Sequence, residues 1–120
     1  MAYYTGFVIA VPTANRQAYA DFARKGWPHF RKLGAVRLVE SWGDAVPDGK
    51  LTDMKKAVQA RPDESVVFAW LEWPDKATAE AAEKKMETDP EMAEVSKGMP
   101  FDGKRMIFGG FAPIYDSRDG

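Results

Sequence analysis

The chain lacks cysteine and has one histidine, His29, among its 120 residues. Without cysteine it forms no disulfide, holds no thiolate-bound metal and offers no thiol nucleophile, a composition that suits a reducing compartment. A single histidine is too few for a His-rich zinc or iron site within one chain. We therefore expect neither a metal nor a cofactor.

The chain also lacks a large net charge and long apolar runs. Lys and Arg number 17 against 18 Asp and Glu, so no strong electrostatic field attracts nucleic acid or an anionic membrane. No segment approaches the roughly 18 apolar residues that cross a bilayer. The apolar start, MAYYTGFVIAVP, lacks the positive region of a signal peptide and ends at Pro12. We expect a soluble, cytoplasmic protein with no nucleic-acid partner and no membrane contact.

What is present predicts one domain, residues 1–120, of ordinary globular composition with 45% hydrophobic and 29% charged residues. Residue type and periodicity predict strands at 3–11, 35–43, 65–73 and 105–114. They predict helices at 16–33, 54–60, 76–88 and 90–97. This β-α-β-(short α)-β-α-β order is typical of an α+β, ferredoxin-like split βαβ fold, with a four-stranded antiparallel sheet and helices on one face.

Local signals place the ends of these helices. Thr13 or Asn15 is expected to cap the first helix, and Pro28 is expected to kink or split it near Trp27. Gly34 supplies a left-handed stop. Further signals for the later helices are Thr52 or Asp53 before the short helix, Pro90 in the first turn of the last one, and Gly98 at its end.

The strands carry apolar residues on both faces, although helices on one face predict alternation with polar residues. In 65–73, for example, Phe68 and Trp70 alternate with Ala69 and Leu71. Each large side chain left in water forgoes roughly 1.5–3 kcal/mol. We therefore expect a homodimer packed sheet against sheet. The competing interpretation is that residues 44–62 and the chain ends cover the second face.

Several stretches carry a resemblance: YTGFVIAVP, GAVRLVESWGDAVPDGKLTDMKKAVQARPDESVVFAWLEWP, DPEM and MPFDGKRMIFGGF. In these the chain resembles the YbaA-like family of small bacterial proteins of unknown function. That family is similar to the dimeric α+β barrel superfamily, in which two ferredoxin-like protomers pack their sheets into a barrel. The resemblance implies the same dimer here, with any ligand site between the sheet and its covering helices.

The superfamily includes cofactor-independent oxygenases, haem-degrading enzymes, dismutating enzymes and ligand-binding proteins, so the resemblance implies a kind of site and not one reaction. Two positions depart from the family pattern. Ser41 stands where members usually have Cys, and Ala79-Glu80 where they tend to have Arg-Asp. The resemblance therefore brings neither an essential thiol nor an essential arginine to these positions.

Aromatic residues and His29 are candidates for a ligand site. Tyr4, Trp42 and Trp70 would line a cleft for a small apolar or aromatic molecule, and His29 would enter it as a base or ligand. The alternatives are that the aromatic residues form core or dimer interface, and that His29 lies on the surface.

Charged residues give further candidates. Lys104 and Arg105 would bind a carboxylate or phosphate at the mouth of the cleft. Glu40 and Glu72 lie in otherwise apolar strands, where a half-buried carboxylate with a raised pKa would act as a base. The alternatives are that either one pairs across strands with Arg37 or Arg105, or that it lies near a strand end. The loop acids Asp44, Asp48 and Asp53 lack the spacing of a calcium loop. Gly109-Gly110 marks either a bulge or a close approach.

No phosphate-binding loop, Ser-His-Asp set or dinucleotide motif is present. The leading hypothesis is small-molecule binding in the sheet–helix cleft, with a cofactor-independent, oxygenase-type enzyme as one form of it. The alternative is a non-enzymatic interaction protein whose apolar sheet face serves dimerisation. Whether the chain is an enzyme stays open at this point.

Overall fold

The computed structural model describes residues 1–119 and contains a four-stranded antiparallel sheet in the order β2-β3-β1-β4. The strands are β1 (Tyr3–Pro12), β2 (Arg37–Trp42), β3 (Glu64–Trp73) and β4 (Ile107–Phe111). The long strands β1 and β3 are central, and β2 and β4 form the edges. Order and direction are those of the ferredoxin-like fold, as the sequence predicts.

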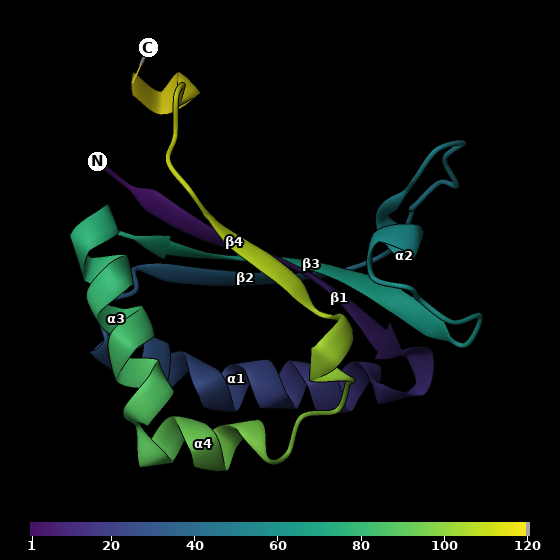
Figure 1. Ribbon diagram of the computed structural model, residues 1–120, viewed down its shortest axis with the longest axis horizontal. Coiled ribbons are helices and arrows are strands. Elements are labelled where there is room, and N and C mark those ends of the chain that lie inside the picture. The colour runs from purple at the N-terminus through teal and green to yellow at the C-terminus, as the bar shows by residue number, and fades with distance from the viewer. Residues whose placement is uncertain (120) are drawn as a thin grey trace.

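Helices α1 (Arg16–Lys32), α3 (Lys76–Thr88) and α4 (Pro90–Ser96) lie on one side of the sheet, and the short α2 (Met54–Ala57) lies on the other (Figure 1). Single 3-10 turns occur at η1 (Thr13–Asn15), η2 (Gly103–Arg105) and η3 (Ser117–Asp119). Within residues 1–119, none of the helices combines the length and apolar character that crossing a bilayer requires.

The register assigns each strand residue to a face. Phe7 pairs with Ala69 and with Phe108, and Ala69 pairs with Glu40 across the other edge, so these four side chains point toward the helices. The largest fully buried residues on that face are Val11, Val67, Leu71 and Trp73. The core of the domain therefore lies between the sheet and the helices.

The second face is partly covered. Ala10 and Val66 are buried there under Val58, which follows α2. Further along the same face Phe68 is 46% exposed and Phe111 is 60% exposed. The 44–62 connection thus covers one end of this face only, and several apolar side chains at the other end stay in contact with solvent.

Helix α1 runs through Pro28 without a break, so of the two outcomes expected near Trp27, a kink or a split, the split is wrong. Pro28 is exposed, and water can hydrate the carbonyl that its missing N–H leaves free. The helix ends as expected: Gly34 has φ +107°, a left-handed conformation that side-chain-bearing residues rarely adopt.

The predicted caps are right for two helices. Asp53 accepts a hydrogen bond from the Lys56 N–H at the start of α2, and Pro90 occupies the first turn of α4. Asn15 precedes α1 but makes no capping bond. Its side chain instead donates to the Pro100 carbonyl at 2.9 Å. Gly98 follows α4 but takes no left-handed conformation.

Strand β4 is shorter than the predicted 105–114. At its start, Arg105 belongs to η2, where the Asp102 side chain accepts a hydrogen bond from the Lys104 N–H. At its end, Pro113 has no N–H to donate to a sheet ladder. The Gly109-Gly110 pair keeps a regular register against Gly6 and Thr5, so it forms no bulge there. The structure shows the close approach instead, because a side chain at Gly110 would overlap the Tyr3 hydroxyl.

Candidate functional site

The helix-covered face of the sheet is not completely filled by side chains. Two cavities lie between this face and the helices, one of about 470 Å³ beside α3 and one of about 160 Å³ beside α1 and α4. Phe7, Phe30 and Leu71 belong to the walls of both. The two cavities therefore adjoin, and together they form a groove under the sheet.

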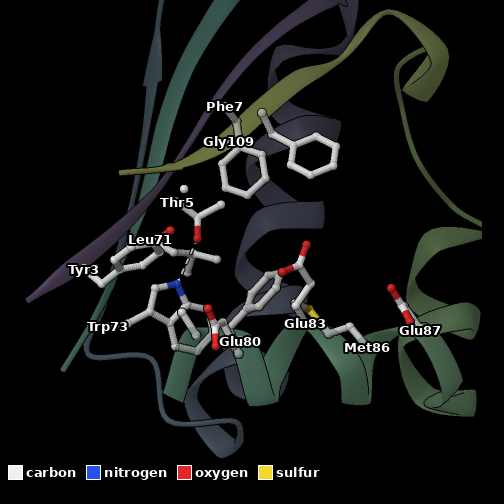
Figure 2. Close-up of a pocket in the computed structure, with 14 residues that line it drawn as sticks. Tyr3, Thr5, Phe7, Leu71, Trp73, Glu80, Glu83, Met86, Glu87 and Gly109 are labelled. Carbon is white, nitrogen blue, oxygen red and sulfur yellow. Dashed lines mark hydrogen bonds between the residues drawn. The ribbon is translucent and has the colours of Figure 1, made fainter. Parts of the chain in front are cut away.

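The larger cavity has an aromatic floor and an acidic rim. Figure 2 shows Tyr3, Thr5 and Trp73 on the sheet side, with the carboxylates of α3 on the opposite side. The Trp73 indole N–H donates to the Thr5 hydroxyl at 3.0 Å. This bond satisfies the polar atom of a residue that is otherwise buried. The residues of α3 that face the cavity are Ala79, Glu80, Glu83, Met86 and Glu87.

The smaller cavity holds a phenol–carboxylate pair. The Tyr19 hydroxyl, from α1, donates to Glu40 Oε1, from β2, at 2.7 Å. Tyr19 is 4% exposed, whereas Glu40 belongs to an edge strand and the residue as a whole is exposed. The remaining walls are almost entirely apolar: Phe7, Ile9, Phe22, Ala23, Gly26, Phe30, Leu38, Leu71, Met92, Val95, Ser96, Met99, Phe101 and Met106.

The surroundings of this pair shift the pKa values of both groups. Desolvation raises the pKa of the Glu40 carboxyl above its ordinary value, and the hydrogen bond from Tyr19 opposes that rise only in part. Burial, together with the neighbouring Glu40 charge, raises the pKa of the Tyr19 phenol well above its usual range. The phenol therefore stays protonated and acts as a donor, and the carboxylate is the basic group of the groove.

Aromatic rings hold Tyr19 in place. Its ring lies 5.6 Å from that of Phe101 and 6.4 Å from that of Trp42, centroid to centroid. Phe101 belongs to the segment between α4 and η2, from which Met99 and Phe101 line the cavity. The Asn15–Pro100 hydrogen bond ties this segment to the start of α1. The rings of Phe101 and Trp42 and the hydrogen bond to Glu40 therefore hold the Tyr19 phenol in place.

The structure separates the sequence-predicted site residues. Trp42 lies on the helix-covered face beside Tyr19, while Tyr4 and Trp70 lie on the opposite face, in a broad hollow bordered by the C-terminal segment. His29 lies at the end of α1, where its Nδ1 is 3.2 Å from Glu91 Oε2 of α4. These four residues do not meet in one site.

Lys104 and Arg105 lie in η2, away from the groove lining. The Arg105 guanidinium donates to both oxygens of Glu64 at 2.6 Å, with side chains only 13% and 3% exposed. Its partner is thus neither Glu40 nor Glu72, the two acids weighed from the sequence. This chain itself supplies the carboxylate that binds Arg105.

Two of the three loop acids have structural partners. Asp53 caps α2, and Asp48 lies 3.2 Å from Lys55 Nζ. Across residues 1–119, no group of three or more His, Cys, Asp or Glu side chains is placed to hold a metal ion.

Sequence reasoning singled out Glu40 as a carboxylate in an apolar strand and missed Tyr19 as its partner. Tyr19 falls in the apolar stripe of α1, where a ring at helical spacing indicates core. The available signal was its hydroxyl, because a buried tyrosine O–H usually finds a hydrogen-bond partner.

Comparison with known proteins supports the resemblance and the fold. A family model described as "Protein of unknown function (DUF1428)" matches residues 2–103. The "Uncharacterized protein YbaA" of Escherichia coli is 52% identical over 116 residues, covering 97% of this chain and 99% of that protein. The resemblance to the YbaA-like family is therefore confirmed.

Solved structures with the same fold are distant in sequence. A dimeric ferredoxin-like protein from an uncultured marine organism has a TM-score of 0.64 at 11% identity, covering 95% of this chain and 96% of that chain. SnoaB, a cofactor-independent oxygenase from Streptomyces nogalater, has a TM-score of 0.58 at 14% identity, covering 96% of this chain and 95% of that chain. Likeness at this level shows the fold and carries no residue roles.

Proposed function

The chain belongs to the DUF1428 family, and on that premise we propose that it binds a small, flat, largely apolar molecule in the groove between sheet and helices. The observation that carries the proposal is the unfilled space under the sheet, two adjoining cavities of about 470 and 160 Å³. Protein interiors are close-packed, and voids larger than a water molecule are few. An apolar cavity with a few convergent polar groups is the usual form of a ligand site.

The groove also contains one group that a cofactor-free reaction site would need, the Glu40 carboxylate. SnoaB shares the fold and is an oxygenase without a cofactor, and we extend that reaction class to this chain as part of the proposal. Such a reaction would start with transfer of a substrate proton to the Glu40 carboxylate, leaving the electron pair on the substrate. Dioxygen would then take electrons from the resulting carbanion and form a C–O bond, giving after protonation a hydroperoxide whose O–O bond breaks with loss of water to leave a carbonyl. A basic carboxylate with a raised pKa, placed in an apolar cavity, supports the first step.

The test measures binding of 2-methoxynaphthalene, a neutral two-ring probe, by fluorescence. Ala23 lines the smaller cavity, so Ala23→Phe should fill it and weaken binding at least about tenfold. Ala93→Phe on the exposed surface of α4 is the matched control and should leave the affinity unchanged. Absence of binding to the wild-type chain, or equal binding by both variants, would contradict the proposal.

The remaining features of the chain fit a homodimer in the cytoplasm, which we propose as the working form. The apolar side chains on the second face support a sheet-against-sheet partner, and the lack of cysteine suits a reducing compartment. The alternative is an interaction protein that uses only this face. It would be favoured if the chain dimerised, the groove bound no probe, and no dioxygen were consumed.

A further inference from the structure

Only one of the two Glu40 carboxylate oxygens, at the end of the groove, accepts a hydrogen bond from a described residue. Glu40 Oε1 receives the Tyr19 hydroxyl at 2.7 Å, and within residues 1–119 neither Glu40 oxygen has another hydrogen-bond or ion-pair partner. An ionised carboxylate can accept about four hydrogen bonds. Oε2 therefore retains its full capacity, on a side chain that lines the cavity.

The Tyr19 hydroxyl determines which kind of ligand group the Glu40 carboxylate can bind. Because the phenol hydrogen already points to Oε1 and the raised pKa of Tyr19 keeps it in place, the pair presents an acceptor to the cavity and no free charged donor. A ligand carboxylate or phosphate would face Glu40 with a like charge. A ligand hydroxyl would instead supply the missing donor.

The other walls leave Glu40 as the single charged group at this end. The lining comes from β1, β2, β3, α1, α4 and the 97–106 segment, and among its described residues only Tyr19 and Glu40 are titratable. Ser96 is the one further polar side chain. Arg16 stacks over Trp42 at 5.9 Å and does not line the cavity. A bound ring would therefore contact apolar walls everywhere except at the Glu40–Tyr19 pair and at Ser96.

We propose that the Glu40–Tyr19 pair selects ligands that carry a weakly acidic hydroxyl, a phenol or an enol, on a flat apolar body. The hydroxyl donates to Glu40 Oε2, while Tyr19 orients the carboxylate through Oε1. Glu40 is the specificity-determining residue and Tyr19 is its positioning residue. This inference rests on the proposed function, because it names the ligand class of the same groove.

The test compares two probes that differ by one donor, 2-naphthol and 2-methoxynaphthalene. A hydrogen bond to a charged acceptor predicts at least about tenfold tighter binding of 2-naphthol to the wild-type chain. Glu40→Gln replaces the charged acceptor by a neutral carbonyl, so the ratio of the two affinities should fall toward one. Glu72→Gln, a carboxylate change on the opposite face of the same sheet, is the matched control and should keep the preference.

A pH series separates positioning from mere packing. The preference should be present when Glu40 is ionised and should disappear as the pH falls through the pKa of Glu40, which desolvation of the carboxyl raises above its ordinary value. Tyr19→Phe keeps the ring and removes the hydrogen bond that lowers this pKa, so the preference should be lost at a higher pH. A Tyr19 with only a packing role would leave the midpoint unmoved.

The outcomes separate the two proposals. If the wild-type chain binds neither probe, the proposed function fails, and this inference fails with it. If it binds both probes equally, or if Glu40→Gln keeps the preference, the groove is a ligand site but Glu40 does not select the hydroxyl. Thermal unfolding of each variant identifies any loss of fold, and Tyr19→Phe alone still tests the inference if Glu40→Gln is unstable.

Discussion

The Arg105 side chain joins the 3-10 turn η2 to the start of β3. Its guanidinium donates to both Glu64 oxygens, to the Gln59 carbonyl at 2.9 Å and to Asp102 Oδ2 at 3.1 Å. A two-pronged contact of this kind is the strongest geometry available to an arginine–carboxylate pair. Because both side chains are covered, removing one partner leaves the other with a charge that water barely reaches.

This pair should contribute to stability in a pH-dependent way. Arg105 lowers the pKa of Glu64 from 4.5 to about 2, so the stabilisation is present above pH 4.5 and is lost as the pH falls toward 2. Glu64→Gln should therefore cost about 2 kcal/mol at neutral pH and flatten the acid limb of a urea-unfolding series. Glu94→Gln, which removes the exposed pair with Lys97, should cost less than about 0.5 kcal/mol. Equal losses in the two variants would contradict this assignment.

At the residue scale, the sequence identifies which side chains are chemically unusual, but not which residues they contact in the fold. Glu40 stands out because an acid in an apolar strand is unusual. Its partner is 21 residues away on another element, and the partner of Arg105 is 41 residues away. Such pairings depend on how α1, β2 and β3 pack together, which no local pattern contains. The presence of an aromatic residue likewise does not show which face of the sheet it occupies, since Trp42 and Trp70 lie on opposite faces.

At the element scale, boundaries set by local chemistry were predictable. The bounds of α3 agree with the sequence pattern because the Asp75 side chain caps the helix through the Thr78 N–H. The exit of α1 was predictable for the same reason, since Gly34 is the residue type that a left-handed stop requires. Pro28 was misleading because the cost of a proline depends on whether its freed carbonyl meets water, and that depends on which face of α1 is exposed.

The exit of α1 is a testable element-scale feature. At Gly34 a side chain would be strained by φ +107° and would approach the Thr78 methyl group to 2.6 Å, so Gly34→Ala should destabilise the fold by about 1–2 kcal/mol. Gly98→Ala is the matched control, because Gly98 has an ordinary φ and no atom within 4 Å of the added carbon. Its unfolding midpoint in urea should move little. A Gly34→Ala chain as stable as Gly98→Ala would show that the turn tolerates a side chain.

At the scale of the whole molecule, the sheet has two apolar faces, and its long helices cover only one of them. The apolar sequence on both strand faces made this predictable, and the structure adds that Val58 covers one end of the second face. The remainder includes Phe68, Ile107 and Phe111 at 46%, 44% and 60% exposure. Apolar side chains gathered on one face mark an interaction surface more often than scattered ones do. Their position on the sheet favours a flat partner, and a second copy of this sheet is flat and apolar in the same places.

A charge placed on this face should therefore separate the protomers. Phe68→Asp puts a carboxylate among apolar side chains, where an unpaired charge costs several kcal/mol on burial, so the variant should be monomeric while the wild-type chain is a dimer at micromolar concentration. Leu51→Asp is the control, because Leu51 is 98% exposed in the loop before α2 and away from the sheet; it should remain dimeric. Native mass spectrometry gives the mass of each species directly.

The groove lies on the other face, so the monomeric Phe68→Asp chain should still bind 2-methoxynaphthalene, and this separates loss of the interface from loss of the fold. A wild-type monomer at that concentration would mean that the second face has another partner.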